Sequence, residues 1–210
     1  LKNQNKIFSV IALISLSVLS YLGYQRFIAE PKETEAISEL NQAQYFFELA
    51  LVSNESDSLF KLALNGGEGK YGFLDIVDEY SGTKAANLAN YSIGMSYLNL
   101  KEYDKAIVYL EKFNSDDILL KSISLGTIGD CFSELNQPKE AFEYYKKAFK
   151  HNENIYTTPK YLFKAALLGS ELGEYRSALN YLNRIKEEFP DSYEFSLVEV
   201  QIGRIENLNN

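Results

Sequence analysis

Apolar residues follow two different patterns along this chain. Between Lys6 and Arg26 lie 19 uncharged residues, and residues 7–22 are Ile, Leu, Val, Ala, Ser and aromatic throughout. From residue 34 onward, apolar residues instead recur every three or four places among charged ones, which is the period of one helix face. The sequence has no sustained alternation of period two that would argue for a sheet. The pattern therefore predicts an all-α fold.

The first apolar run predicts a transmembrane helix at residues 7–25. At 1.5 Å per residue, such a helix spans roughly 28 Å, close to the hydrocarbon core of a bilayer. Tyr21 and Tyr24 would lie at the far interface, where aromatic residues gather. Because the run is apolar all round, lipid suits it better than a protein core does. The membrane-facing positions that we expect are Ile7, Ile11, Ile14, Val18 and Leu22.

A cleaved secretory signal is the competing interpretation of the same run. Lys2 and Lys6 make a basic start, and several Ser residues interrupt the apolar ones. No A-x-A-like cleavage site follows, however, and the single Cys is Cys131, too far away for a lipoprotein junction. These observations favour an uncleaved signal anchor.

Basic residues on the two sides of the run set its orientation only weakly. Lys2 and Lys6 precede the run, and Arg26 and Lys32 follow it. The default for a signal anchor is a short cytoplasmic end, here residues 1–6, with the bulk of the protein outside. We therefore expect a single-pass inner-membrane protein whose carboxyl-terminal bulk lies in the periplasm.

The rest of the chain divides at turn signals. Pro31 is expected to end the membrane helix, so that residues 26–33 form a polar linker. Residues 34–83 are then predicted to be the amino-terminal helices of the folded part, and residues 191–210 a carboxyl-terminal capping helix and tail. Between them, residues 84–190 carry a repeat.

The repeat consists of a small residue, an aromatic residue or Gly three places later, and an Ala twelve places after the small residue. Its Ala members are 35 and then 37 places apart, close to the 34-residue period of tetratricopeptide repeats. In that pattern, small residues mark where two antiparallel helices approach each other. The period predicts three tetratricopeptide repeats stacked as an α-solenoid, which is a surface for holding other proteins. The three instances are Gly94, Tyr97 and Ala106; Gly129, Phe132 and Ala141; and Ala166, Gly169 and Ala178.

The sequence also resembles a known family. Residues 62–89 read LALNGGEGKYGFLDIVDEYSGTKAANLA, and the repeats that follow contain YSIGMSYLNLKEYDKAIVYL and GTIGDCFSELNQPKEAFEYYKKAF. These segments resemble the membrane-anchored tetratricopeptide repeat proteins of Bacteroidota, whose layout is similar to that of the YfgM-type ancillary subunits of the SecYEG translocon. The resemblance implies association with the SecYEG translocon and with a PpiD-like periplasmic chaperone. Exported client proteins are the third kind of protein partner that we expect.

The concave face of such a solenoid is the expected binding surface. The first helix of each pair lines this face. Side chains that do not pack between the two helices of a pair, in what we call the helix seam, are available to a ligand. They make a mixed apolar and acidic wall that suits a helix or an extended segment of a protein. The alternative, that these side chains face further helices of the same chain, stays open, because the helices at residues 34–80 could fold across the groove. The expected partner-binding residues are Leu88, Tyr91, Met95, Leu98, Asp130, Glu134, Phe163 and Leu167.

Composition argues against several classes of function. The formal net charge is −8 and the Lys and Arg residues are scattered, so nucleic acid is not an expected partner. His151 is the sole His, and Cys131 lies at helical spacing among apolar residues, as a core thiol does. Because no metal-ligand cluster and no nucleophile beside a base can be found, we expect no catalytic residue, metal, cofactor or small-molecule substrate.

These observations predict a non-catalytic, membrane-anchored periplasmic protein-binding scaffold. The resemblance makes it an ancillary translocon subunit that links SecYEG to chaperones such as PpiD or to emerging client proteins. The alternative is a tetratricopeptide adaptor for another envelope process, such as cell division or outer-membrane biogenesis. A degenerate accessory enzyme of the lytic or peptidase type is a third interpretation, and the missing catalytic constellation argues against it.

Overall fold

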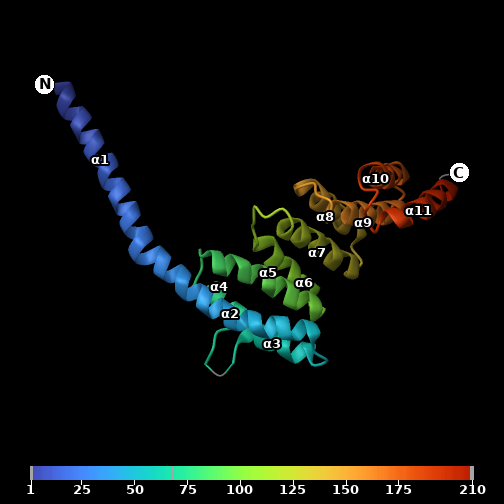
Figure 1. The fold of residues 1–210 in the computed structure, drawn as a ribbon, viewed down its shortest axis with the longest axis horizontal. Coiled ribbons are helices and arrows are strands. Elements are labelled where there is room, and N and C mark those ends of the chain that lie inside the picture. The colour runs from blue at the N-terminus through green and yellow to red at the C-terminus, as the bar shows by residue number, and fades with distance from the viewer. Residues whose placement is uncertain (1, 68, 209–210) are drawn as a thin grey trace. The chain divides into compact units, whose positions relative to one another are not determined.

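The computed structural model describes residues 2–67 and 69–208, and within them the fold is helical (Figure 1). The β pairing among these residues is one isolated bridge between Gly67 and Lys70. The chain forms two compact units, residues 1–89 and 90–210. The elements are α1 (Lys2–Tyr24), a π-helical turn η1 (Gln25–Ala29), α2 (Glu30–Val52), α3 (Ser56–Asn65), α4 (Phe73–Glu79), α5 (Lys84–Asn99), α6 (Tyr103–Lys112), α7 (Leu120–Glu134), α8 (Pro138–His151), α9 (Thr158–Glu171), α10 (Tyr175–Glu188) and α11 (Phe195–Leu208).

The membrane-helix candidate does not end at Pro31, and the prediction of a linker at residues 26–33 was wrong. α1, η1 and α2 follow one another without a break. A Pro inside an α-helix lacks an N–H and presses its ring on the carbonyl four residues back. Here the Glu30 N–H bonds instead to the Gln25 carbonyl, five residues back, and Pro31 falls in the first turn of α2. The wider π turn thus lets the helix pass the Pro.

The core of the first unit is built on one face of α2. The side chains of that face are small except for Leu40 and Phe47, so that α3 approaches closely. The Phe47 ring packs edge to face against Phe60 of α3 and Phe73 of α4, with ring centroids 5.7 and 6.1 Å apart. This buried face agrees with the helical spacing of apolar residues from residue 34 onward. The buried residues of the α2 face are Ala36, Leu40, Ala43, Phe47 and Ala50.

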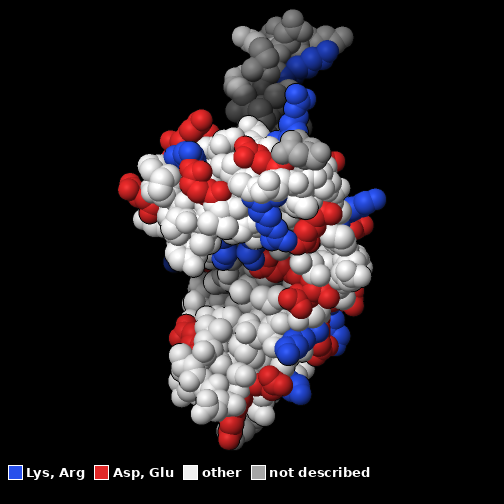
Figure 2. Space-filling view, turned by 90° about the vertical axis from the view of Figure 1, so that its right-hand side faces the viewer, with Lys and Arg blue, Asp and Glu red and all other residues white. Residues whose placement is uncertain are grey.

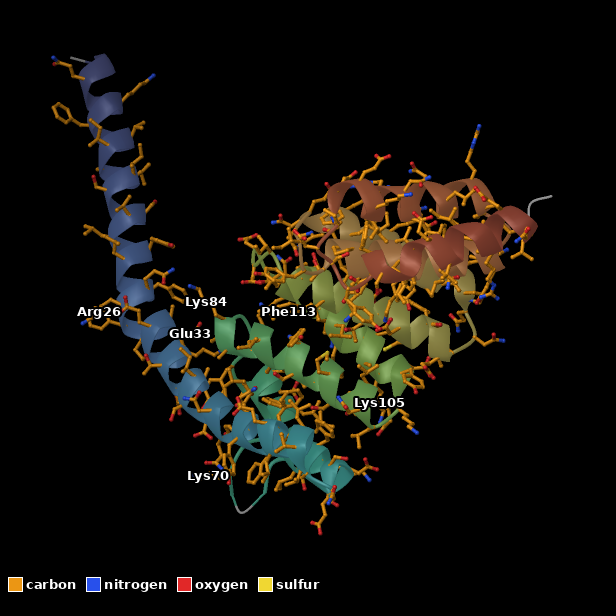
Figure 3. All side chains as sticks on the ribbon, turned by 45° about the vertical axis from the view of Figure 1, so that its right-hand side comes forward. Arg26, Glu33, Lys70, Lys84, Lys105 and Phe113 are labelled. Carbon is orange, nitrogen blue, oxygen red and sulfur yellow. The ribbon has the colours of Figure 1, made fainter. Side chains whose placement is uncertain are left out.

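A carboxylate on α2 caps the start of α5. The two Glu33 side-chain oxygens accept hydrogen bonds from the Lys84 and Ala85 N–H groups, at 2.7 and 3.0 Å. Figure 3 shows Glu33 beside Lys84. The first N–H groups of a helix have no partner within it, and a negative charge there also suits the helix dipole. Glu33 therefore ties α2 to the first turn of α5.

The helix seams lie where the repeat pattern placed them. A Cβ atom added to Gly94 would lie 2.4 Å from Leu110, and one added to Gly129 would lie 2.7 Å from the Tyr145 ring. Only Gly allows the helices of these pairs to approach this closely. In the third repeat, Ala166 and Ala178 are both fully buried.

The turn inside each helix pair has the same backbone form. Lys101, Asn136 and Gly173 have positive φ angles of 61°, 56° and 80°, and they are 35 and then 37 places apart. Each of these residues ends the first helix of its pair in the left-handed conformation. The N–H group of the following residue then donates a hydrogen bond to a carbonyl in the last turn of that helix. These bonds run from Glu102 to Tyr97, from Gln137 to Phe132 and from Glu174 to Gly169, at 2.8, 2.9 and 2.7 Å.

The last helix, α11, packs on α10 in the second unit. Ser192 caps it by accepting a hydrogen bond from the Phe195 N–H at 3.2 Å. Val198 and Ile205 are each 1% exposed. Phe195 is 39% exposed because it is the first residue of α11, ahead of the turns that pack on α10.

Candidate protein-binding groove

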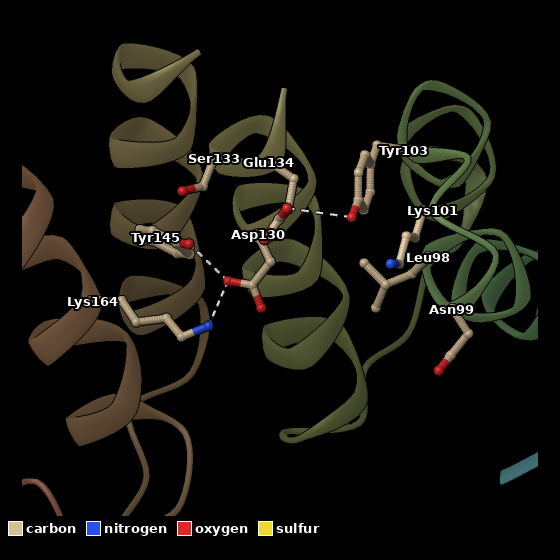
Figure 4. A pocket seen from close by; sticks show the side chains of 9 residues that line it. All are labelled: Leu98, Asn99, Lys101, Tyr103, Asp130, Ser133, Glu134, Tyr145 and Lys164. Carbon is tan, nitrogen blue, oxygen red and sulfur yellow. Dashed lines mark hydrogen bonds and ion pairs between the residues drawn. The ribbon is translucent and has the colours of Figure 1, made fainter. Parts of the chain in front are cut away.

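A hollow on the second unit, which we call the inner groove, brings together the ends of several helices (Figure 4). Its volume is about 510 Å³, within the range of ligand pockets. α5, α6 and the turn between them form one side, α7 the floor, and α8 and α9 the other side. The lining residues are Leu98, Asn99, Lys101, Tyr103, Asp130, Ser133, Glu134, Tyr145 and Lys164.

Asp130 is the centre of the polar network in the inner groove. One of its carboxylate oxygens accepts hydrogen bonds from the Tyr145 hydroxyl, at 2.7 Å, and from the Lys164 ammonium group. The Tyr145 ring stacks on Tyr161, with centroids 6.3 Å apart. Burial, and secondly the charge of Asp130, raise the pKa of Tyr145, so its hydroxyl stays a donor. The carboxylate is thereby held in one orientation.

A second bond crosses the inner groove from α6 to α7. The Tyr103 hydroxyl donates to Glu134 at 3.3 Å, and desolvation followed by the charge of Glu134 raises the pKa of this hydroxyl. Leu98 lies on the same side as Tyr103 and supplies an apolar wall (Figure 4). The groove therefore combines fixed carboxylates with an apolar contact.

A smaller hollow of about 190 Å³ continues the inner groove along α9. It shares Ser133, Tyr145 and Lys164 with the larger one and adds Leu167 and Glu171, together with Leu168. The extended surface offers apolar, acidic and basic side chains side by side. Such a surface can hold the backbone and alternate side chains of a protein segment.

The structure brings together half of the residues predicted to bind a partner. Leu98, Asp130 and Glu134 line the inner groove, and Leu167 lines its extension. These four positions supply two apolar and two acidic side chains to the surface.

The other four predicted residues lie elsewhere. The Tyr91 ring packs against Phe113, with centroids 5.2 Å apart, and burial raises the pKa of its hydroxyl. Phe163 packs against the core of the second unit. Met95 is partly buried, and Leu88 belongs to the first unit and is 38% exposed. Tyr91 and Phe163 thus contact other side chains of the second unit.

Sequence reasoning missed several lining residues. Lys101 and Tyr103 belong to the turn and the second helix of a repeat, whereas the prediction considered first helices only. The ring of Tyr145 packs against Gly129 between α7 and α8, and its hydroxyl reaches Asp130 in the groove. Lys164 lies three places before Leu167 on α9, one turn away on the same face. That spacing could have identified Lys164 as a lining residue.

The apolar residues of α1 face outward. Val10, Leu13, Leu16 and Leu19 are each more than half exposed. Among the described residues, one helix is long and apolar enough to cross a membrane, and a cleaved secretory signal has the same signature. The predicted anchor residues Ile11, Ile14, Val18 and Leu22 are 50–59% exposed, and the side chain of Ile7 lies outside the described residues.

The side chains that could carry chemistry are placed as structural groups. Cys131 is fully buried, and burial followed by the charge of Asp130 raises the pKa of its thiol to about 12. A thiol with such a pKa is not a nucleophile at neutral pH. Within the described ranges, no group of three or more His, Cys, Asp or Glu residues could hold a metal ion.

Family models agree with this architecture. Two models described as tetratricopeptide repeat match residues 89–115, 123–154 and 160–192. The chain is an all-helical tetratricopeptide-repeat solenoid, and no enzyme family is indicated. No curated protein matches it in sequence.

Solved structures share the fold. The crystal structure of MamA protein is 14% identical, with a TM-score of 0.52, and the match covers 83% of this chain and 80% of that one. A Podosopora anserina putative kinesin light chain with nearly identical TPR-like repeats is 12% identical, with a TM-score of 0.54, over 84% of this chain and 88% of that one. A single-substitution variant of that protein gives the same score over 84% and 87%. At this identity the likeness shows the fold alone.

Proposed function

We propose that this protein is a non-catalytic scaffold, anchored in the inner membrane by α1, that holds protein partners in the periplasm through the inner groove. Tetratricopeptide repeats indicate a protein-interaction scaffold. One observation carries the proposal. The exposed apolar helix α1 continues without a break through η1 into α2, one of the helices that precede the repeats. A chain with this layout positions a binding surface at a membrane.

The partners that we propose are the SecYEG translocon, a PpiD-like chaperone and emerging client proteins. The anchor would contact the translocon laterally within the membrane. The inner groove would receive a segment of the chaperone or client, since its fixed Asp130 and its Leu98 and Leu167 walls suit a segment with both polar and apolar side chains.

Affinity purification of the full chain in mild detergent tests this function. We compare the wild type, a groove variant carrying Leu98→Asp and Glu134→Lys, and a matched control, Glu206→Lys, whose charge change lies on the exposed side of α11. Translocon subunits should be recovered with all three proteins. Recovery of the periplasmic chaperone or client should fall about tenfold with the groove variant alone, because such anchors dominate binding.

Two results would contradict the proposal. Recovery of division or outer-membrane assembly proteins in place of translocon subunits would support the alternative adaptor. A mature protein that lacks α1 and is found free of membranes would show that the apolar run is a cleaved signal.

A further inference from the structure

A second hollow of the second unit, which we call the loop pocket, lies away from the inner groove. The α8–α9 and α10–α11 connections form it, and its volume is about 430 Å³. It shares no lining residue with the inner groove. Its lining residues are Ile155, Tyr156, Glu188, Phe189, Pro190, Asp191, Ser192, Tyr193 and Glu194.

The loop pocket displays large apolar side chains that the core does not use. Ile155, Tyr156 and Tyr193 are 68%, 69% and 77% exposed. Single exposed apolar residues are ordinary, but three around one hollow mark a contact surface. Tyr is also among the residue types that dominate binding energy at protein interfaces.

The first loop holds its apolar residues in a fixed form. The Asn154 side-chain oxygen accepts hydrogen bonds from the Tyr156 and Thr157 N–H groups, at 2.9 and 2.8 Å. Its amide nitrogen donates to the Asn152 carbonyl and the Thr157 hydroxyl. These hydrogen bonds order the loop before a ligand binds, so binding would lose little conformational entropy of the loop.

An arginine joins this loop to α10 by pairing with carboxylates on both, and Asp191 and Glu194 add further acidic groups to the rim of the pocket. Arg184 pairs with Glu153 of the loop at 3.1 Å and with Glu188 through two bonds of 2.8 and 2.9 Å. These bonds hold the pKa of Glu188 below its usual range, so it stays ionised. Asp191 and Glu194 complete the rim, and none of the described lining residues is a Lys or Arg.

We infer that the loop pocket binds an extended segment of a partner protein in which a large apolar side chain is flanked by Lys or Arg. The apolar side chain would pack among Ile155, Tyr156 and Tyr193, and the basic groups would face Asp191 and Glu194. Charge selects this occupant among the alternatives. A second copy of a chain with net charge −8 would present the same acidic rim, and anionic lipid headgroups would be repelled. The site adds a contact that does not depend on the inner groove.

Selection from a random twelve-residue phage-displayed peptide library tests the inference. The full chain in nanodiscs is the bait, beside three variants: Tyr156→Ser with Tyr193→Ser, Asp191→Lys with Glu194→Lys, and the control Tyr45→Ser, an aromatic residue 59% exposed on α2. Circular dichroism melting checks that each variant folds, which is expected because the altered side chains are exposed.

Peptides lost with the two loop-pocket variants but kept with Tyr45→Ser should carry Leu, Ile or Phe next to Lys or Arg. For one such peptide, synthesised with a fluorescent label, the double Ser variant should weaken binding at least tenfold, by loss of two aromatic contacts. The double Lys variant should instead favour peptides with Asp or Glu. An absence of peptides specific to the pocket, or a specific set without basic residues, would overturn the inference. So would loss of self-association as the sole effect of the Ser variant, since the occupant would then be a second copy.

Discussion

At the scale of single residues, the inner groove depends on tyrosine hydroxyls that remain protonated. Tyr145 donates to Asp130, and Tyr103 donates to Glu134. A phenol next to a carboxylate keeps its proton because ionisation would place two negative charges side by side. The groove thus obtains ordered carboxylates without a cation at each one.

The pH dependence of stability should report on buried tyrosines. Tyr161 is 1% exposed, and burial followed by the charge of Asp130 raises the pKa of its hydroxyl above its usual value near 10. Its contribution is therefore fully present below pH 10 and is lost as pH rises toward the folded-state pKa, because the unfolded chain releases the proton first. One fully linked proton corresponds to about 1.4 kcal/mol per pH unit.

Tyr161→Phe should therefore flatten the loss of stability above pH 10, since the ring is kept and the titrating group is removed. Urea unfolding followed by circular dichroism at pH 8, 10 and 11 measures the slope. An equal slope in variant and wild type would show that Tyr161 titrates normally.

The sequence predicted a residue's environment correctly where its spacing and chemistry both pointed to the core. Cys131 was placed in the core from its helical spacing, and it is fully buried. The bond from Tyr145 to Asp130 was not predicted, because it requires knowing the direction in which a side chain leaves the seam. Spacing along the chain predicts on which face of a helix a residue lies, but it does not predict which group a side-chain hydroxyl contacts.

At the scale of elements, Gly residues set how closely neighbouring helices approach. A Cβ atom on Gly126 of α7 would lie 2.0 Å from the ring of Tyr161 on α9. That ring is buried and stacked on Tyr145, so it has little room to move. The contact joins the second and third repeats.

Gly126→Ala should destabilise the protein by about 2 kcal/mol, since overpacking outweighs the better helix propensity of Ala. Gly203→Ala is the matched control, because Gly203 lies within α11 with nothing within 4 Å of the added Cβ, and it should stabilise by about 0.5–1 kcal/mol. Chemical unfolding of both variants measures the difference. A Gly126→Ala protein as stable as the wild type would contradict the close packing of α7 on α9.

The period of the repeat predicted the helix pairs well, since small residues recur where backbones meet. The break expected at Pro31 did not occur, because one π turn absorbed the Pro. A sequence pattern marks Pro as a stop, but it does not show whether a neighbouring turn can widen.

At the scale of the whole molecule, the surface is acidic in total but mixed in detail. Figure 2 shows basic and acidic side chains interspersed over the face that it displays. The scattered charge agrees with a protein that binds segments of other proteins at small sites and not a polyanion along a stripe. Sequence reasoning could predict a long apolar helix followed by a solenoid, but the identity of a partner depends on surface residues that the repeat pattern leaves free to vary.

Photocrosslinking in intact cells tests the central claim most directly. Benzoylphenylalanine is placed at Leu13 of the anchor, at Leu98 of the inner groove and, as a control, at the exposed Glu206, and the adducts are identified by mass spectrometry. We expect translocon membrane subunits crosslinked from Leu13, a periplasmic chaperone or exported protein crosslinked from Leu98, and neither from Glu206. Adducts from Leu98 that contain only this chain, together with no membrane protein from Leu13, would contradict it.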